Sequence, residues 1–346
     1  MKFTIFFRTL FASSFLLSYA NSIQSQEGEL VFEEVIVTAE KRDESLQSVS
    51  QAVTAITDSE IDAKNITSFV DLSSIVPGVT VAKNEGYKTI ISIRGVGNET
   101  NQNAIAAPSV AYHMDGIFIA SPFSLQTDFI DVQRIEVLRG PQGTLFGQNS
   151  TGGAINVISN KPTTDERFSK ADITYGDYGM KQLRSSSNFP ISDNVSTKLS
   201  LSAMTREGFT ENLATGQDLD DAHNLSFRTD WMIDVNDTTS LRIFGQYSSV
   251  DRNGAAIRGI DDQSPGMRKL SQNTISKQEL TSSVFAMIFE TDLGYASLKI
   301  LASSQEDDIS VTRDNDRHNF GDPVLSIPGL GAGATYQQAE FRPETS

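Results

Sequence analysis

Hydrophobic and polar residues alternate one by one over several stretches of the second half of the chain. In the segment 225–235, Leu225, Phe227, Trp231, Ile233 and Val235 share one face, and Ser226, Arg228, Asp230 and Asp234 share the other. Residues 198–204 follow the same rule, as does the segment from Leu241 to Tyr247. A period of two predicts β-strands with one apolar and one polar face.

Strands of about 9–11 residues with this pattern suit a transmembrane barrel that has an apolar exterior and a polar lumen. A water-soluble sandwich shows the same alternation locally, so the pattern alone leaves both architectures open. The connections favour the barrel, because short periplasmic turns and long extracellular loops are typical of it. Tight turns at 192–194, 236–237 and 293–294 alternate with long segments at 207–222, 251–278 and 307 to about 335, and the short loop 176–179 is the one exception.

The first half of the chain has a different pattern, and residues 45–160 predict a small α/β unit. Strands are expected at 52–56 and 90–95, and the segments 110–113 and 117–120 predict a hairpin around Asp115-Gly116. Thr57 to Glu60 has the sequence of a capping box, which predicts a short helix through Lys64. Residues 67–76 predict a second short helix that Pro77-Gly78 stops.

A glycine-rich run separates two apolar strands between Val132 and Pro162. A phosphate-binding loop would need a lysine after a suitably spaced glycine. No such lysine is present, and the run from Gly143 to Gly153 carries no charge. The glycines therefore indicate a compact structural turn.

The stretch R-I-E-V-L-R-G-P, followed by glycines and G-A-I-N-V, resembles the end of the plug domain of TonB-dependent outer-membrane receptors. P-G-V, I-R-G and the hairpin also match, although this chain has His113-Met114-Asp115 where family plugs usually carry Val-Asp. The resemblance implies an α/β plug followed by the first strands of an antiparallel transmembrane β-barrel, which has 22 strands when complete. The plug-motif residues are then Arg94, Gly95, Asp115, Gly116, Glu136, Arg139, Gly140, Gly147, Gly152 and Gly153.

The N-terminal residues predict a signal peptide and, after it, a second short motif. Residues 1–26 have the basic start, short apolar core and small-x-small site of a signal peptide, with cleavage expected near Ala20. Glu33, Glu34, Val35, Ile36, Val37, Thr38 and Ala39 then resemble the TonB box, which implies an exposed peptide that TonB captures by strand addition. An ordinary edge strand is the simpler alternative.

These segments give four regions: signal peptide 1–26, box segment 27–44, plug 45–162 and barrel part 163–346. About seven strands are expected in the last region, with an eighth starting near Thr335. Because this is about a third of a plugged barrel and the end lacks the family's terminal aromatic residue, we expect the chain to be an N-terminal fragment.

Composition excludes several functions. The net charge of −16 argues against a nucleic-acid partner, and the absence of cysteine removes disulfides and thiolate chemistry. No catalytic constellation is visible, no cofactor or metal is expected, and His113 is interpreted as structural. Arg94, Glu136 and Arg139 lie in or beside apolar strands, where they either form salt links to the barrel wall or are solvated.

The resemblance implies energised import of a scarce nutrient across the outer membrane of a Gram-negative bacterium. Its partners would be TonB with the inner-membrane ExbB–ExbD complex, outer-membrane lipid and a small-molecule ligand such as a ferric chelate. Ligand would bind at the plug apex, with Asn98, Glu99, Asn101, Gln102 and Phe123 as candidate contacts, and binding would release the box to TonB. A signal-transducing receptor and a passive porin-like channel are the alternatives.

Overall fold

The computed structural model describes residues 35–38, 44–84, 88–97, 108–121, 124–259, 262–314 and the strand 337–341. The chain divides into two units, 1–34 and 35–346, and all described residues belong to the second. The expected signal peptide, three of the box residues (Glu33, Glu34 and Ala39) and the apex candidates Asn98, Glu99, Asn101, Gln102 and Phe123 lie outside the described residues.

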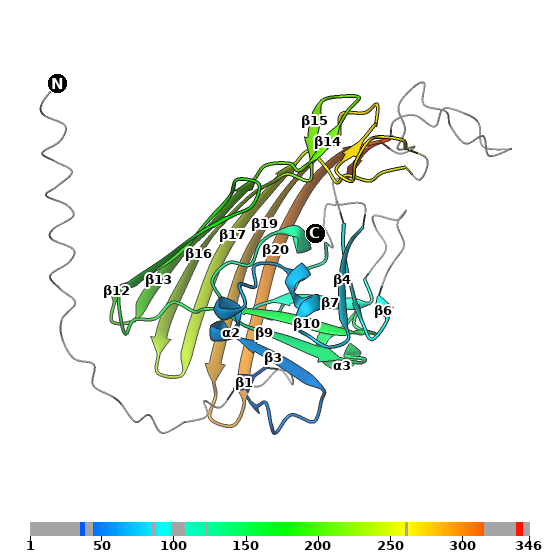
Figure 1. The fold of residues 1–346 in the computed structure, drawn as a ribbon. Helices are drawn as coiled ribbons and strands as arrows, with labels where there is room; N and C mark the ends of the chain where they lie inside the picture. Colours follow the sequence, from blue (N-terminus) through cyan, green and yellow to red (C-terminus); the bar gives the residue numbers. More distant parts are fainter. Residues whose placement is uncertain are drawn as a thin grey trace, which may run out of the picture. The chain divides into compact units, whose positions relative to one another are not determined.

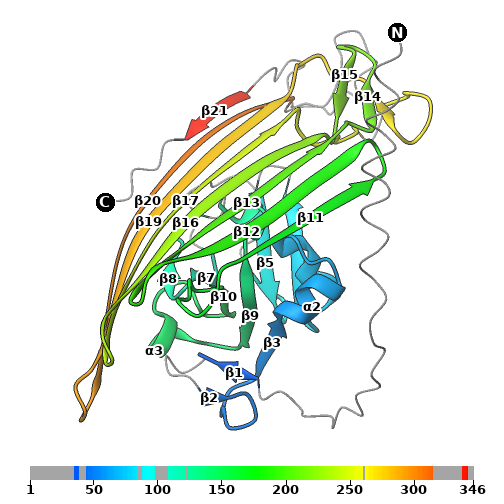
Figure 2. The same cartoon turned by 90° about the vertical axis from the view of Figure 1, so that its left-hand side faces the viewer.

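The second half of the chain forms one antiparallel sheet of eight strands in the order β11-β12-β13-β16-β17-β19-β20-β21, which Figure 2 shows side by side. The strands are β11 (Phe168–Gly176), β12 (Met180–Ser192), β13 (Val195–Arg206), β16 (Ala222–Asn236), β17 (Thr239–Arg252), β19 (Lys277–Asp292), β20 (Ser297–Arg313) and β21 (Gln337–Phe341). The expectation of seven strands and an eighth near residue 335 is confirmed. Within the described residues the sheet does not close on itself.

The two faces of this sheet differ as the alternation predicts. Leu225, Phe227 and Trp231 on β16 are 44%, 43% and 40% exposed. Arg228 and Asp230, which alternate with them, are each 2% exposed. Because successive side chains of a strand point to opposite faces, one face is apolar and exposed and the other is polar and covered.

Connections between the long strands alternate in length. The short turns β12–β13, β16–β17 and β19–β20 lie at one end of the sheet, and the long connections lie at the other end, which we call the outer end (Figure 1). The outer connections contain a small sheet in the order β15-β14-β18, made by β14 (Thr210–Asn212), β15 (Gln217–Leu219) and β18 (Lys269–Leu270). The sequence pattern gave no sign of these three short strands.

The α/β unit is built on a second sheet, in the order β3-β9-β10-β7-β8. Its strands are β3 (Val53–Thr57), β9 (Val132–Arg139), β10 (Gly153–Ser159), β7 (Val110–Met114) and β8 (Ile117–Phe118). Strand β10 pairs parallel with β7 and antiparallel with β9, and Asp115-Gly116 turn the hairpin β7–β8. A side chain at Gly153 would collide with the Leu138 carbonyl, which explains a glycine at this close approach.

A third sheet and short helices complete the α/β unit. The sheet contains β4 (Val79–Asn84), β5 (Lys88–Ile93) and β6 (Val96–Gly97), and the helices are α2 (Asp58–Ala63), η1 (Phe69–Ser74), η2 (Ser124–Gln126) and α3 (Gly143–Phe146). The capping box at Thr57 and Glu60 is confirmed. Two predictions were inaccurate: η1 is a 3-10 helix, and Arg94-Gly95 form a turn with positive φ at the point where the strand was expected to continue.

One hydrophobic core joins the α/β unit to the eight-stranded sheet. Phe69, Tyr112 and Ile155 of the α/β unit belong to the same buried cluster as Phe244 and Ile288 of the large sheet. The covered face of the large sheet is therefore apolar where this core reaches it, and not polar throughout as the sequence suggested. Among the described residues, the helices are all too short or too polar to span a membrane.

Candidate functional site

The described part of the box segment is a strand on the α/β unit. Strand β1 (Ile36–Val37) pairs antiparallel with β2 (Glu44–Ser45), and the Leu46 N–H donates to the Val35 carbonyl over 2.9 Å. The main-chain groups of alternate residues point to opposite sides of a strand. Those of Val35 and Val37 therefore face β2, whereas those of Ile36 and Thr38 face away from it.

Burial of the box differs from what its sequence predicted. Val37 is fully buried in a cluster that contains Leu138 and Ala154 of the central sheet. Ile36, its neighbour, is 40% exposed. The expectation of an exposed peptide is therefore wrong for Val37, because a neighbouring apolar pocket of the α/β unit accepts its side chain.

The next residue, Thr38, is bound by a buried carboxylate on β9. Its N–H donates to Glu136 Oε1 over 2.7 Å, and its hydroxyl donates to Glu136 Oε2 over 2.9 Å. Arg134 Nε donates to the same carboxylate over 2.9 Å and Asn156 Nδ2 over 3.3 Å. Glu136 is 0% exposed, so its charge depends on these donors in place of water.

Within the part of the chain that the structure describes, Arg94, Glu136 and Arg139 form none of the salt links to the barrel wall that were considered for them. Glu136 pairs with Arg134 inside the α/β unit, and Arg139 donates to the Thr54 hydroxyl over 3.0 Å on the neighbouring strand. Arg94 is exposed, which agrees with the solvated alternative. Strand β9 is an inner strand of its own sheet, so the charges at its start and end meet partners from that sheet.

A different carboxylate, Asp115, joins the α/β unit to the large sheet. Its Oδ2 accepts from Arg228 Nη2 over 2.8 Å and its Oδ1 from Arg242 Nη1 over 3.3 Å. Asp230 lies between the two arginines, at 3.0 Å from Arg228 and 2.6 Å from Arg242. The side chains of all four are between 2% and 4% exposed, so two carboxylates and two guanidinium groups form a neutral buried cluster.

Asp115 is well supplied with donors. The Ser159 N–H and hydroxyl both donate to its Oδ1 over 3.0 Å. Burial by itself would raise the pKa of Asp115, but Arg242, Arg228 and Ser159 outweigh it and hold the pKa well below its usual range. The Arg228 guanidinium also stacks over the Phe244 ring, 3.9 Å from its centroid. Asp115 is therefore ionised and fixed.

Two further contacts tie the same unit to the sheet. Asp131 accepts from Lys198 on β13 over 2.8 Å and from the Ser200 hydroxyl over 3.0 Å. Lys170 on β11 lies 2.6 Å from Asp62 of α2, but this pair is about half exposed. The two contacts differ in burial. Water therefore screens the Lys170–Asp62 pair far more than the Asp131–Lys198 pair.

Towards the outer end, uncharged donors replace the cations as partners of the carboxylates. The Ser124 hydroxyl donates to Asp307 over 2.9 Å, and Gln278 donates to Gln126 over 2.8 Å. Asn224 donates to Asp128 Oδ1 over 3.0 Å, whereas Asp128 Oδ2 is buried without a hydrogen-bond partner. The segment from Ser124 to Asp128 thus docks along strands β16, β19 and β20.

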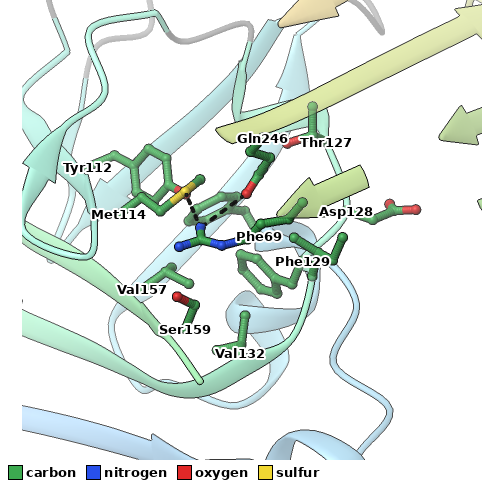
Figure 3. Close-up of a pocket in the computed structure, with 12 residues that line it drawn as sticks. Phe69, Tyr112, Met114, Thr127, Asp128, Phe129, Val132, Val157, Ser159 and Gln246 are labelled. Carbon is green, nitrogen blue, oxygen red and sulfur yellow. Dashed lines mark hydrogen bonds between the residues drawn. The ribbon is translucent and has the colours of Figure 1, made fainter. Parts of the chain in front are cut away.

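A small cavity lies between the ionic cluster around Asp115 and the contacts of the segment from Ser124 to Asp128 (Figure 3). Its volume is about 20 Å³ for the centres of water molecules, which is room for roughly one. Met114 and Gln246 line it, and each accepts from Arg228 Nη1 over 3.4 Å, as the dashed lines in Figure 3 show. The cavity is too small for a nutrient, so it is a packing feature of the interface.

Other motif residues shape the backbone. Gly95, Gly116, Gly140, Gly147 and Gly153 all have positive φ, and a side chain at Gly152 would collide with the Val96 carbonyl. His113 is buried beside the rings of Phe118 and Phe146. In the part of the chain that the structure describes, no group of three His, Cys, Asp or Glu residues could hold a metal ion.

Sequence reasoning missed Asp131, Ser159, Lys198 and the roles of Arg228, Asp230 and Arg242. The signal was present on β16 and β17, because charged residues occupy the polar face of strands whose other face is apolar. Charges on a covered face need partners. The sequence did not say which residues of the α/β unit would supply them.

A comparison with family models matches residues 45–154 to the TonB-dependent Receptor Plug Domain. Among curated proteins, the pesticin receptor of Yersinia pestis is 31% identical over 226 residues, which cover 63% of this chain and 32% of that protein. The vitamin B12 transporter BtuB of Vibrio vulnificus (strain CMCP6) is 30% identical over 161 residues, covering 45% and 25%. The chain thus spans about a third or less of the length of these relatives.

Solved structures have the same fold. The ferric yersiniabactin uptake receptor FyuA of Yersinia pestis aligns with a TM-score of 0.65 and 20% identity, over 76% of this chain and 42% of that one. The ferripyoverdine receptor of Pseudomonas aeruginosa aligns with a TM-score of 0.67 and 16% identity, over 83% and 38%. At these identities the likeness concerns the fold alone.

Proposed function

Because this chain belongs with the TonB-dependent receptors, through its plug domain and the barrel strands after it, we propose that it serves energised import across a Gram-negative outer membrane. The plug, formed by the α/β unit, gates the barrel to which the eight-stranded sheet belongs. Residues 33–39 are the box that TonB captures, with the ExbB–ExbD complex as the energy source. The imported ligand is a scarce nutrient such as a ferric siderophore, and the apolar outer face of the sheet contacts lipid.

The observation that carries this proposal is the attachment of the box to the plug. Strand addition uses main-chain groups of the captured peptide. On the edge of β1 that faces away from β2, the Thr38 N–H is already bound to Glu136, whereas the Ile36 main-chain groups have no partner among the described residues. TonB therefore gains the whole edge only after Thr38 leaves Glu136.

The attachment is weak enough to be reversible. Strand β1 has two residues, and a typical hydrogen bond contributes about 0.5–1.5 kcal/mol net, or about 1.5–3 kcal/mol when a charged group is involved. Burial of a valine side chain adds about 1.5–3 kcal/mol. A ligand that binds more tightly to the released state by a few kcal/mol would shift this equilibrium towards release.

The plug itself is held more firmly to the barrel wall. Its contact through Asp115, Arg228, Asp230 and Arg242 is buried and electrically neutral, so water cannot compete for it. In the proposed mechanism, the box is released first and pulled by TonB, and the plug is rearranged inside the barrel only under that force.

The test is the variant Ile36→Pro in the full-length receptor. Proline removes the Ile36 N–H and cannot donate to an added strand. That N–H faces away from β2, so Val37 remains buried and Thr38 remains bound to Glu136. We expect normal abundance and ligand binding but complete loss of energised uptake.

Ile36→Ala is the matched control, because it shortens the same side chain and keeps the N–H. It should retain most of the uptake, since main-chain bonds dominate strand addition. Uptake and surface binding of the same ligand are measured side by side in both variants. Uptake at the wild-type rate by Ile36→Pro would show that residues 33–39 do not couple transport to energy.

A further inference from the structure

Three connections at the outer end of the barrel wall are bonded to one another. They are 177–179 between β11 and β12, 207–221 between β13 and β16, and 253–276 between β17 and β19, of which the structure describes all but 260 and 261. Surface connections are usually more mobile than the strands they join, because few contacts hold them. Here the contacts run from one connection to the next, and several of them are buried.

The main chains of the second and third connections pair with each other. Strand β14 lies parallel to β18, which belongs to the yellow segment beside β14 in Figure 2. The Glu211 N–H donates to the Arg268 carbonyl over 3.0 Å, and the Leu213 N–H donates to the Leu270 carbonyl over 2.8 Å. These two connections therefore share one small sheet, although more than 50 residues separate its strands β14 and β18 in the chain.

The buried side chain of Asn212 reinforces this pairing. It is 0% exposed. Its Nδ2 donates to the Gln272 carbonyl over 3.0 Å, and its Oδ1 accepts from the Gln272 N–H over 3.0 Å. The same oxygen accepts from the Ala214 N–H over 3.2 Å. A side-chain amide thus makes both main-chain hydrogen bonds of Gln272, and a buried polar group whose hydrogen bonds are made holds its neighbours in one arrangement.

Gln217 on β15 repeats this arrangement with another residue of the third connection. Its Nε2 donates to the Ser276 carbonyl over 2.7 Å, and its Oε1 accepts from the Ser276 N–H over 3.0 Å. Beyond it, the Asp220 N–H donates to the Gly254 carbonyl over 3.0 Å. The bonds between the second and third connections therefore extend along most of the length of both.

The first connection is attached through an aromatic contact. Tyr178 and Gly179 both have positive φ, at 58° and 63°, as in a type I′ turn. Such a turn favours Asn, Asp or Gly at the position of Tyr178. The Tyr178 ring lies 4.9 Å from that of Phe209, and the Arg268 guanidinium lies over both rings, at 5.4 and 4.5 Å from their centroids. This contact among all three connections offsets the cost of the Tyr178 backbone.

We propose that these three connections form one cap, which is assembled before any ligand is bound and which opens only as a unit. Bonded regions of a protein open cooperatively when each part depends on the others for its hydrogen bonds. The cap does not depend on the import function. In a receptor that imports a ligand, however, it would be a fixed wall, and closure over the ligand would not involve movement of 207–221 against 253–276.

The test is hydrogen exchange in the purified full-length receptor without ligand, followed by mass spectrometry at single-residue resolution. Asn212→Ala removes the amide bridge to Gln272. None of the N–H groups of Leu213, Asp220 and Ser276 bonds to the Asn212 side chain. If the cap opens as a unit, exchange at all three should nevertheless accelerate by one common factor, about tenfold or more, since three hydrogen bonds are lost.

Gln217→Ala tests the same dependence in the opposite direction. It removes the bridge to Ser276 and leaves β14 and β18 untouched. Exchange at the Glu211 and Leu213 amides, which pair with β18, should accelerate together with exchange at Ser276.

A disulfide gives a second readout. These 346 residues contain no cysteine, so Glu211→Cys with Lys269→Cys creates one possible disulfide among them. The two residues are register partners, and their exposed side chains lie 2.9 Å apart. Neighbouring strands lie about 4.7–4.9 Å apart, within the Cα separation of about 4.4–6.8 Å that a disulfide needs. The disulfide should form in the ligand-free receptor and slow exchange at Asp220 and Ser276 together.

Two controls separate opening of the cap from a general loss of structure. Met267→Ala changes a side chain of the third connection that is 98% exposed, so it should leave exchange unchanged. The amides of β16 in the barrel wall are the internal reference and should exchange at the wild-type rate in every variant.

Acceleration in Asn212→Ala that is confined to Ala214 and Gln272, the amides bonded to its side chain, would show that the connections open separately. A cysteine pair that stays reduced would show that β14 and β18 are apart without ligand. Equal acceleration on β16 would show that the connections open with the whole barrel. Each of these results overturns the cap.

Discussion

Two buried carboxylates of the plug, Asp115 and Glu136, have opposite surroundings. The Asp115 side chain forms ion pairs with Arg228 and Arg242 of the barrel wall. Asp230 pairs with the same two arginines. Glu136 stays within the plug, and beside Arg134 its closest donors come from Thr38 of the box. The charge of Asp115 is balanced by two buried arginine side chains of the eight-stranded sheet. The charge of Glu136 is partly balanced by donors of Thr38, which follows the two-residue strand β1.

In the proposed mechanism, this difference would let similar chemistry serve attachment in one place and release in another. Breaking a buried ion pair costs several kcal/mol because an uncompensated charge is left behind. When the box leaves, Glu136 keeps Arg134 and Asn156, so the cost of release is limited. We therefore expect the plug to stay docked under conditions in which the box is freed, and three variants test this comparison.

The largest effect is expected for Asp115→Ala. It leaves two buried guanidinium groups with one carboxylate, which should reduce stability by about 3–5 kcal/mol. Thermal unfolding and protease sensitivity of the plug in the full-length receptor measure this loss. Asp237→Ala, in an exposed short turn, is the control. Equal stability of the two variants would mean that the ionic cluster does not hold the plug.

An intermediate effect is expected for Glu136→Gln. The amide keeps the shape but turns one acceptor oxygen into a donor that faces the donors of Thr38, Arg134 and Asn156. The box should detach more easily, and the purified periplasmic domain of TonB should bind the ligand-free receptor roughly tenfold more tightly, since a charged hydrogen bond contributes about 1.5–3 kcal/mol.

Glu166→Gln is the control for this variant, because Glu166 is exposed. Pull-down or surface plasmon resonance with ligand-free receptor gives the comparison. Unchanged affinity for TonB in Glu136→Gln would show that Glu136 does not restrain the box.

The smallest effect is expected for Lys170→Ala. This lysine joins the same plug and sheet as Asp115 does, and its partner Asp62 lies at 2.6 Å, but the two side chains are 55% and 49% exposed. Exposed ion pairs contribute about 0–1 kcal/mol to stability, so the free energy of unfolding should fall by an amount within that range. If Lys170→Ala lost as much stability as Asp115→Ala, burial would not explain which contacts between plug and sheet are strong.

Much of the fold was predictable because local patterns decide it. A period of two places Leu225, Phe227 and Trp231 on one face whatever the neighbouring strands are. Asp115-Gly116 accept positive φ, so the turn of the hairpin could be located before its partners were known. The capping box at Thr57 and Glu60 depends on residues three apart, and it formed as expected.

The contacts of the candidate site followed less directly from the sequence. The charges of Asp115, Glu136 and Arg139 are equally visible along the chain, but only Asp115 meets the barrel wall. The reason is geometric: a hairpin turn presents its side chain beyond the sheet, whereas Glu136 lies on an inner strand whose neighbours belong to the plug. The box strand was likewise expected to be exposed. Leu138 and Ala154, which pack around Val37, lie about a hundred residues further along the chain, so the sequence near Val37 does not indicate its burial.

The sequence by itself determined the strands, their faces and the family resemblance, since these depend on residues close together in the chain. Only the tertiary structure decided which charges are compensated. Asp115 and Arg242 stand 127 residues apart in the chain, and they meet only because the hairpin turn of the plug reaches strand β17. Electrostatic energy depends on distance in space and on burial, and neither can be read from the order of residues.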